Sequence, residues 1–288
     1  MKEAIERMLG NRAQPTGDVP RALQLSLMHG WRERADAGRA ALAFADVGFD
    51  VFSSTWEDGI LLYVFALIGM TNRKCVDIGA GGVDGSNVCN LLVHHGFSGL
   101  LIDGDAESLE VARRFYAGRR ETKLFPPSIR AGFVTAENVS SICKERGFGG
   151  EIDLLCLDID GVDYWIWKAL TEVEPRVVVV EYQDILGPER SWTVPYRRDF
   201  EVASYPVNRE RRNYCGASLR AFERLATSKG YRLVGCNRGG WNAFFVKEGL
   251  ADALLPRVTV ESCLSSDWNR FGMETRFPLV ADLEWQEV

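Results

Sequence analysis

The stretch CVDIGAGGVDGSNV, residues 75–88, decides the fold that this sequence predicts. It begins as a short apolar run with β-branched residues, reaches an acid at Asp77, and then breaks into glycines. In α/β proteins, a buried strand that ends in a glycine-rich turn and leads into a helix is how a nucleotide-type cofactor site begins. The segment therefore predicts an early strand of a parallel sheet, with a cofactor site at its carboxyl end.

The chain that follows repeats this alternation of buried strands and helices. The strand-like segments are 75–79, 99–105, 128–135, 152–160 and 176–183, and the helix-like ones between them include 86–96, 106–118 and 164–170. Continuous apolar strands are covered on both faces, so the pattern predicts a doubly wound, mostly parallel, Rossmann-like sheet. A helix at 218–230 then leads into two strands joined by NRGG (237–240), which predicts an antiparallel C-terminal hairpin.

Composition excludes several classes of protein. The 288 residues carry a net charge of −6, so we expect no binding to nucleic acid or to a membrane surface. The 7 cysteines form no C-x-x-C pair, which argues against a zinc site or a disulfide framework. The N-terminus has no apolar signal segment, and the longest apolar run, residues 60–70, is too short to span a bilayer. These features predict a cytoplasmic protein with a small-molecule partner. They do not decide whether the protein forms a homo-oligomer.

The glycine loop fits a dinucleotide poorly. Aligned on the G-x-G-x-x-G fingerprint, Gly79 and Gly81 match, but Asp84 stands where the third glycine is needed. A carboxylate there would oppose an anionic pyrophosphate, and the chain has no P-loop motif. S-adenosylmethionine (SAM) carries no phosphate and brings positive charge, which Asp77 and Asp84 would favour. Asp103 ends the next strand, at about the 20-residue spacing expected for an acid that binds ribose hydroxyls.

From Phe52 to Val246 the chain resembles class I SAM-dependent methyltransferases of the FkbM-like kind. The segments that carry the resemblance are FSSTWEDGI (52–60), VDIGAGGVDGSN (76–87), GLLIDGD (99–105), IDLLCLDIDGVDYWIWKAL (152–170), VVVVEYQ (177–183) and GYRLVGCNRGGWNAFFV (230–246). The glycine loop and the DxDGxDYWxW run are its specific parts, and the match covers roughly two thirds of the chain. The resemblance implies a seven-stranded sheet that ends in the antiparallel hairpin, with SAM across the ends of the first strands.

The chain divides into three expected parts. Residues 1–70 predict an N-terminal helical cap, residues 71–248 the SAM-binding methyltransferase domain, and residues 249–288 a C-terminal extension. Within the middle part, residues 184–216 are the least regular segment and are rich in aromatic residues and arginines. Such an insert can stack on a ring or pair with an anionic group, so we expect it on the acceptor side, although a solvated loop would have the same composition.

Further residues are expected to contact the cofactor. Thr135 and Ala136, after the third strand, stand where adenine needs a slot, although an ordinary helix N-cap by Thr135 would explain them equally well. The resemblance implies that Glu57 closes over the methionine end of SAM, although acids are also favoured in the first turn of any helix. The expected cofactor-binding set is Glu57, Asp77, Gly79, Ala80, Gly81, Asp84, Asp103, Gly104, Thr135, Ala136 and Asp158.

Three acids follow the fourth and fifth strands. Asp158 and Asp160 come after one strand and Glu181 ends the next, so we expect them to cluster near the transferring methyl group. Such acids serve as a general base, or together they hold a hard cation such as Mg²⁺. The structural alternative is that Asp158 and Asp160 cap the following helix. His94 and His95 lie at the far end of the helix after the glycine loop, so a carboxylate or metal-assisted base is favoured over histidine.

The sequence thus predicts a SAM-dependent methyltransferase for a small-molecule acceptor. The leading acceptor hypothesis is a hydroxyl of a sugar or secondary metabolite, which means O-methylation in natural product biosynthesis, with Asp158, Asp160 and Glu181 as catalytic or metal-binding residues. Two alternatives stay open: an NAD-dependent oxidoreductase on a Rossmann-like fold, and a non-catalytic SAM-binding protein. Asp84 and the terminal hairpin count against the first, and the intact glycine loop counts against the second.

Overall fold

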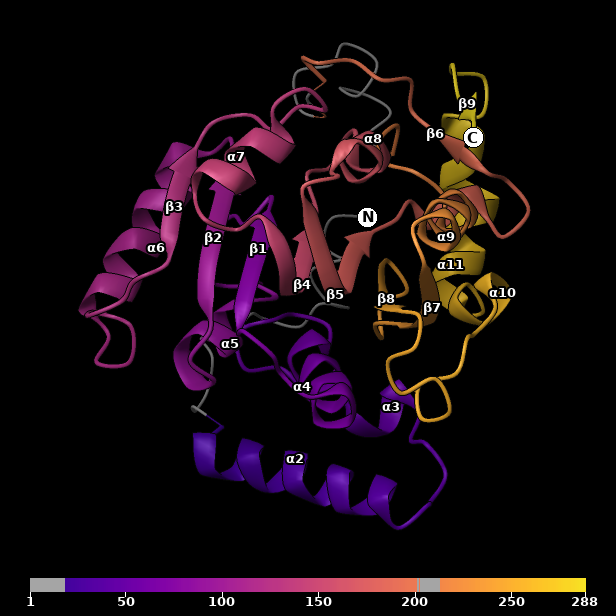
Figure 1. Ribbon diagram of the computed structural model, residues 1–288. Helices are drawn as coiled ribbons and strands as arrows, with labels where there is room; N and C mark the ends of the chain where they lie inside the picture. The colour runs from indigo at the N-terminus through magenta and orange to yellow at the C-terminus, as the bar shows by residue number, and fades with distance from the viewer. Residues whose placement is uncertain (1–18, 201, 203–212) are drawn as a thin grey trace.

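The computed structural model describes residues 19–200, 202 and 213–288. The first 18 residues of the expected cap, and residues 201 and 203–212 of the expected insert, lie outside the described residues. The described chain begins with helices α2 (Arg21–Asp36), α3 (Phe44–Val47) and α4 (Glu57–Ile68). Helix α2 runs along the outer side of α4, at the bottom of the view in Figure 1.

Seven strands form the central sheet, in the order β3-β2-β1-β4-β5-β8-β7. Their bounds are β1 (Lys74–Ile78), β2 (Ser98–Asp103), β3 (Ser128–Ala131), β4 (Gly150–Leu157), β5 (Val173–Glu181), β7 (Tyr231–Cys236) and β8 (Asn242–Lys247). Strands β1 to β5 pair in parallel, whereas β8 is antiparallel to both β5 and β7. The predicted doubly wound sheet with an antiparallel C-terminal hairpin is therefore confirmed.

Helices cover both faces of this sheet because its central strands are apolar on both faces. In β5, for example, Val177 to Val180 are all buried. The covering helices are α5 (Cys89–His94), α6 (Ala106–Gly118), α7 (Val139–Glu145), α8 (Asp163–Ala169) and α9 (Leu219–Ser228). One core joins the sheet to α7, α8 and α9, and the other joins it to α4, α5 and α6. Figure 1 shows α7 and α8 on the side of the sheet opposite to α4 and α5.

The C-terminal extension folds back over the edge of the sheet next to α9. Its elements are α10 (Val260–Cys263), α11 (Asp267–Phe271), the π-helical turn η3 (Gly272–Arg276), the 3₁₀ turn η4 (Phe277–Leu279) and β9 (Gln286–Glu287). Strand β9 pairs antiparallel with the short strand β6 (Trp192–Thr193) of the insert, after the 3₁₀ turn η1 (Asp184–Leu186). Val260 and Val280 are buried in the core that contains α9, so the extension is an integral layer of the fold.

A buried ion pair holds the amino-terminal edge of the sheet. Arg176 Nη1 lies 2.9 Å from Asp153 Oδ1, and the two side chains are 7% and 0% exposed. Asp153 Oδ2 also accepts the backbone N–H of Arg73 at 2.7 Å, and Arg176 Nη2 donates to the carbonyl oxygen of Ile68 at 2.8 Å. These bonds tie the end of α4 and the turn before β1 to β4 and β5.

Two other expectations from the sequence can be compared with the structure. The helix expected at residues 86–96 is shorter than predicted, because α5 covers only Cys89–His94. In the turn before α5, the Ser86 hydroxyl accepts backbone N–H groups, so the helix begins later. All 7 cysteines are free, as their spacing predicts. Within the described part of the chain, no helix combines the length and apolar character needed to cross a membrane.

Candidate active site

Two cavities open at the carboxyl ends of the parallel strands. The larger has a volume of about 560 Å³ and lies over the ends of β1, β2, β3 and β4. The smaller has a volume of about 200 Å³ and lies beyond the end of β5. Asp160 lines both cavities, so they meet at this residue. We call them the large cavity and the small cavity.

The large cavity is lined mainly by strand ends and by the turns that follow them. Its lining residues are Ile78, Gly79, Gly81, Ile102, Asp103, Gly104, Asp105, Gly132, Phe133, Val134, Asp158, Ile159, Asp160, Val162, Arg198, Phe200 and Val202. From the expected cofactor-binding set, the structure brings together here Gly79, Gly81, Asp103, Gly104 and Asp158. The volume lies within the range of cofactor and small-molecule sites, about 300–1,000 Å³.

The glycine loop is shaped by two close approaches. Gly79 has a φ of +86°, and a Cβ atom added to it would lie 1.5 Å from the carbonyl oxygen of Asp158. Gly81 donates its N–H to Asp103 Oδ2 at 2.7 Å, and Asp103 Oδ1 accepts the N–H of Asp105 at 2.7 Å. Only glycine at position 79 lets the ends of β1 and β4 come this close. Asp103 fixes the loop while it faces the cavity.

Three expected cofactor residues of the loop region lie elsewhere. Asp77 is buried beneath the loop, where burial and the nearby carboxylates of Asp158 and Asp103 raise its pKa to about 8. Asp84 is exposed on the outside of the turn, and Ala80 is buried. Among the described residues, none of the three lines the large cavity. Their contact with a cofactor stays a prediction.

Glu57 is held within the protein rather than in the large cavity. Its Oε1 accepts hydrogen bonds from Asn237 Nδ2 at 2.7 Å and from Asn242 Nδ2 at 3.0 Å. Its Oε2 accepts the N–H of Thr55 at 2.9 Å. These bonds join the start of α4 to the C-terminal hairpin, so the observed role of Glu57 is to connect these two elements.

The segment after β3 carries Thr135 and Ala136, whose expected contact with adenine stays a prediction. The N–H of Thr135 donates to Asn138 Oδ1 at 2.8 Å, and that of Ala136 donates to the Tyr196 hydroxyl at 3.0 Å. The N-cap of α7 is Asn138, so the alternative that Thr135 caps this helix is wrong. Phe133 lines the large cavity instead, with its ring 61% exposed. The sequence analysis missed Phe133, although an aromatic residue just after a strand end was a usable signal.

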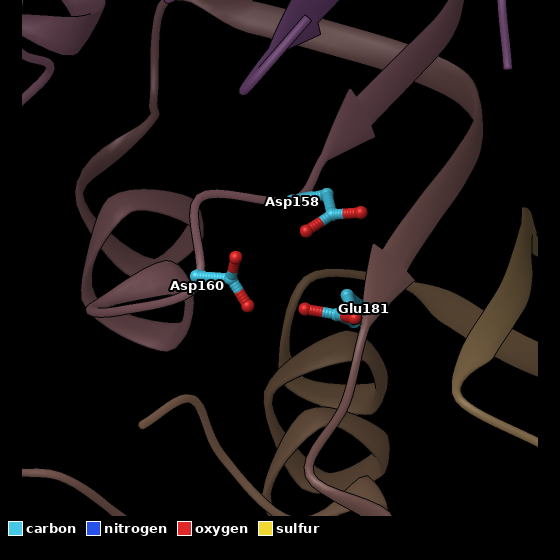
Figure 2. Close-up of side chains that lie close together, drawn as sticks. All are labelled: Asp158, Asp160 and Glu181. Carbon is cyan, nitrogen blue, oxygen red and sulfur yellow. The ribbon is translucent and has the colours of Figure 1, made fainter. Parts of the chain in front are cut away.

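Asp158, Asp160 and Glu181 form one cluster where the two cavities meet. One carboxylate oxygen from each of the three residues lies within 4.8 Å of the other two. Figure 2 shows Asp158 at the end of one strand, Asp160 on the loop that follows it, and Glu181 at the end of the neighbouring strand, with the three carboxylates facing a common space. The predicted clustering is confirmed. Asp160 has a φ of +52°, a left-handed conformation that is strained for a residue other than glycine.

The crowding of these acids changes their protonation. Burial and then the neighbouring carboxylate of Asp160 raise the pKa of Asp158 to about 7. Burial, Asp158 and Asp160 raise the pKa of Glu181 well above its usual value, and burial raises that of Asp160. Asp158 is therefore close to half-protonated at neutral pH, the condition in which a carboxyl group accepts a proton efficiently.

Asp163 orders the turn between β4 and α8. Its Oδ1 accepts the N–H of Ile159 at 2.8 Å and its Oδ2 accepts the N–H of Gly161 at 3.0 Å. No side chain caps the start of α8, so the structural alternative that assigned capping to Asp158 and Asp160 is wrong. Those two acids are left facing the cavities, while Asp163 supports the backbone that carries them.

The small cavity is built from segments that are far apart in the sequence. Its lining residues are Asp160, Asp163, Glu181, Tyr182, Gln183, Asp184, Asn213, Cys215, Gly216, Trp241, Trp268 and Arg276. The expected acceptor-side insert contributes Asp184, Asn213, Cys215 and Gly216, but Trp268 and Arg276 come from the C-terminal extension. The sequence analysis missed these two, because no local motif marks them.

The histidines lie away from both cavities. His94 ends α5, and His95 Nε2 lies 2.8 Å from Gln24 Oε1. Burial, followed by the charges of His94 and Arg21, lowers the pKa of His95 to about 4. In the part of the chain that the structure describes, no histidine lines either cavity.

No protein-family model matches this sequence, and no curated protein matches it. Solved structures do match. A putative caffeoyl-CoA O-methyltransferase from Staphylococcus aureus is 12% identical with a TM-score of 0.42, covering 85% of this chain and 97% of that one. The magnesium protoporphyrin IX methyltransferase ChlM from Synechocystis PCC 6803, with bound SAM, is 10% identical with a TM-score of 0.38, covering 86% and 91%. TnmH is 16% identical with a TM-score of 0.38, and the match spans 79% of this chain and 59% of that chain.

Similarities this low identify no family for the chain.

Proposed function

We propose that this protein is a SAM-dependent methyltransferase that acts on a small-molecule acceptor. The observation that carries the proposal is the junction of two cavities at one cluster of acids, with Asp160 lining both. In this arrangement SAM occupies the large cavity, and the acceptor occupies the small one. A methyl group delivered at the junction would then reach the acceptor beside Asp158, Asp160 and Glu181.

The charge of the large cavity favours SAM over a dinucleotide. Its lining carries four acids, Asp103, Asp105, Asp158 and Asp160, against one cation among the described residues, Arg198. A pyrophosphate would meet mostly negative charge there, whereas the sulfonium and amino groups of SAM would be attracted. The glycine loop brings backbone close to the cavity, as a bound cofactor needs, and in this proposal Asp103, which lines the cavity, binds the ribose hydroxyls.

The acid cluster supplies the base. When bound, SAM supplies an electrophilic methyl group on a sulfonium, and S-adenosylhomocysteine is the product that leaves. Asp158, with its pKa raised to about 7, would accept the proton of the acceptor hydroxyl. A hydroxyl acceptor and kinship with the FkbM-like methyltransferases are the finer parts of this proposal. They are supported by the carboxylate-rich junction and by the sequence segments quoted above.

A metal-assisted variant of this chemistry is the second candidate. The cluster offers three carboxylates within 4.8 Å of one another, which are oxygen donors of the kind that Mg²⁺ takes. Mg²⁺ keeps several waters of its own, so three protein ligands are sufficient. A bound cation would lower the pKa of an acceptor hydroxyl and would hold all three acids ionised.

Calorimetric titration with SAM, S-adenosylhomocysteine and NAD, each with and without Mg²⁺, tests the proposal. We expect the two SAM-type ligands to bind with about micromolar Kd values, and Asp103→Ala to weaken them at least about tenfold. Glu145→Ala, which removes an exposed acid from the end of α7, is the control and should leave both Kd values unchanged. Binding of NAD alone would overturn the proposal, and a gain in affinity with Mg²⁺ would favour the metal-assisted variant.

A further inference from the structure

Two cysteines meet where the C-terminal hairpin packs against the C-terminal extension. Cys236 ends β7, Cys263 ends α10, and the two lie 27 positions apart in the chain. The Sγ atom of Cys236 lies 3.5 Å from the carbonyl oxygen of Cys263, and the Tyr182 hydroxyl lies 3.4 Å from the same oxygen. The two thiols also hydrogen-bond to each other. The fold therefore brings two thiols from separate elements into direct contact.

Cys236 differs from the other cysteines in its exposure. All 7 cysteines lie among the described residues, and all except Cys236, which is partly exposed, are buried. The hydrogen bond with Cys263 lowers the pKa of Cys236 further than burial raises it, and a hydrogen bond with Tyr182 adds to this. Burial instead raises the pKa of Cys143 to about 11. Thiolate character and access from solvent, the two conditions for a reactive cysteine, thus coincide at Cys236.

We propose that Cys236 and Cys263 are a redox modification site, at which a peroxide converts the two thiols into a disulfide. Cys236 is the cysteine that the oxidant attacks, and Cys263 is the resolving cysteine. Neither residue lines the large or the small cavity, as far as the described residues go, so the inference stands apart from the proposed function. It rests on the contact between the thiols and on the exposure of one of them.

The reaction has two steps, with hydrogen peroxide as the oxidant. In the first, the thiolate sulfur of Cys236 attacks one oxygen of the peroxide, the O–O bond breaks, and the leaving hydroxide takes up a proton to become water. In the second, the sulfur of Cys263 attacks the sulfur of this sulfenic acid. The S–O bond breaks, and hydroxide leaves with the proton of Cys263 as a second water. The two thiols together lose two electrons, which reduce one peroxide to two waters.

Cys263 is suited to the second step rather than to the first. Its hydrogen bond with Cys236, followed by burial and by the charge of Cys236, raises the pKa of Cys263. Formation of the sulfenic acid removes that charge, so Cys263 then loses its proton more readily. Because Cys263 is buried, a peroxide from solvent reaches Cys236 first. The order of the two steps therefore follows from the surroundings of the two thiols.

The disulfide would join the two segments that carry the tryptophans of the small cavity. Trp241 lies between β7 and β8, and Trp268 lies in α11, the helix after α10. Their ring centroids are 6.5 Å apart, and both residues line the small cavity. A bond that closes this loop of the chain restricts the unfolded state, so oxidation should stabilise the fold that holds this wall.

Oxidation of the folded protein with a small excess of hydrogen peroxide tests the proposal. We expect the intact mass to fall by about 2 Da, and peptide mapping to find the bond between Cys236 and Cys263 at least about tenfold above any other cysteine pair. Dithiothreitol should restore the original mass. The urea midpoint of the oxidised protein should lie about 1 M above that of the reduced protein.

Single-cysteine variants separate the two roles, and circular dichroism checks that each variant is folded. Cys263→Ser should stop at the sulfenic acid of Cys236, which dimedone traps, and Cys236→Ser should lower both dimedone labelling and disulfide at least about tenfold. Cys143→Ala removes a buried cysteine of α7 and should form the disulfide as the wild type does.

The same treatment in urea distinguishes a property of the fold from ordinary thiol chemistry. Unfolding removes the contact between the two thiols, so the preference for this pair should disappear. An equal preference in urea would overturn the inference. So would a folded wild type that keeps all 7 thiols after peroxide, or one in which Cys236 pairs with another cysteine or with a second chain.

Discussion

The two ends of strand β4 carry acids in opposite situations. Near its amino end, Asp153 is paired with Arg176 at 2.9 Å. Although burial alone would raise the pKa of Asp153, the Arg176 guanidinium and the N–H groups of Thr71 and Arg73 hold it below its usual value. Just after its carboxyl end, Asp158 faces Asp160 and Glu181, and burial and then the carboxylate of Asp160 raise its pKa to about 7. One strand thus has a compensated acid at one end and an uncompensated acid at the other.

This difference shows how the molecule separates stability from reactivity. The compensated end stabilises the fold, because each charge and each N–H group there has a partner. The uncompensated end is less favourable for folding, yet it is where a proton can be accepted near neutral pH. What holds the uncompensated end in place is backbone packing, since Gly79 abuts the carbonyl of Asp158.

The largest effect is expected where that backbone packing is removed. In Gly79→Ala the new Cβ atom would lie 1.5 Å from the carbonyl oxygen of Asp158, and the φ of +86° is itself unfavourable for alanine. We expect a loss of about 4–5 kcal/mol in the free energy of unfolding, measured by urea titration, with loss of cofactor binding. Gly82→Ala is the matched control, because nothing lies within 4 Å of its Cβ position, and it should change stability by about 0.5 kcal/mol or less.

Removing the compensated acid should have the next largest effect. Asp153→Ala leaves Arg176 buried without its anionic partner, so we expect a loss of about 3–4 kcal/mol in the free energy of unfolding. The double variant Asp153→Ala, Arg176→Met should recover part of this loss, because it also removes the unpaired charge. Glu174→Ala, at an exposed acid of β5, should stay within about 0.5 kcal/mol of wild type. A similar loss in all three variants would contradict the special position of Asp153.

Removing the uncompensated acid, Asp158, should raise the free energy of unfolding instead of lowering it. Asp158→Asn takes one charge out of the acid cluster, so we expect the free energy of unfolding at pH 8 to rise by about 1–2 kcal/mol. Methyl transfer to an identified acceptor should fall at least about 100-fold, because the base is lost. Asp163→Asn is the contrasting variant. It removes an acceptor of the N–H groups of Ile159 and Gly161 and should destabilise the protein. Equal destabilisation by both substitutions would show that Asp158 is a structural acid like Asp163.

The sheet and part of the lining of the large cavity were predictable because their signals are local. The β-branched strands, the glycine loop and the NRGG turn each predict the backbone conformation of their own residues. Together they predicted the parallel sheet with its hairpin. Gly79, Gly81 and Asp103 follow strand ends, and parallel strands bring such residues to one edge. The same rule brought Asp158, Asp160 and Glu181 together.

The remainder depends on contacts between distant parts of the chain. Trp268 and Arg276 reach the small cavity only because the extension folds back over the sheet edge. The residues next to them in the sequence do not predict this folding. The hydrogen bond between Glu57 and Asn237 joins residues 180 positions apart in the chain, so the sequence could not show it, and the contact of Glu57 with a cofactor stays a prediction. Asp163 was closer to prediction, since it belongs to the quoted DxDGxDYWxW run. Telling it apart from Asp160 needs the backbone geometry of the turn.

The smallest effect between neighbouring measurements is expected in the pH dependence of stability, in which the two ends of β4 act in different ranges. Because the pKa of Asp158 is raised to about 7, the folded protein keeps a proton that the unfolded chain releases near pH 4. The free energy of unfolding that this retained proton contributes is therefore lost as the pH rises from about 4 to about 7. The loss is at most about 1.4 kcal/mol per pH unit for each retained proton.

Asp153 gives the reverse dependence. Its pKa is lowered, so the stability it contributes is present above about pH 4 and is lost as the pH falls further. Urea midpoints measured from about pH 3 to pH 8 should pass through a maximum near pH 4–5. Asp158→Asn should reduce the change of the urea midpoint with pH only above the maximum. Asp153→Asn should reduce it only below the maximum. If either variant altered both limbs alike, the two acids would not be acting as independent ends of one strand, because distant sites without shared partners contribute additively.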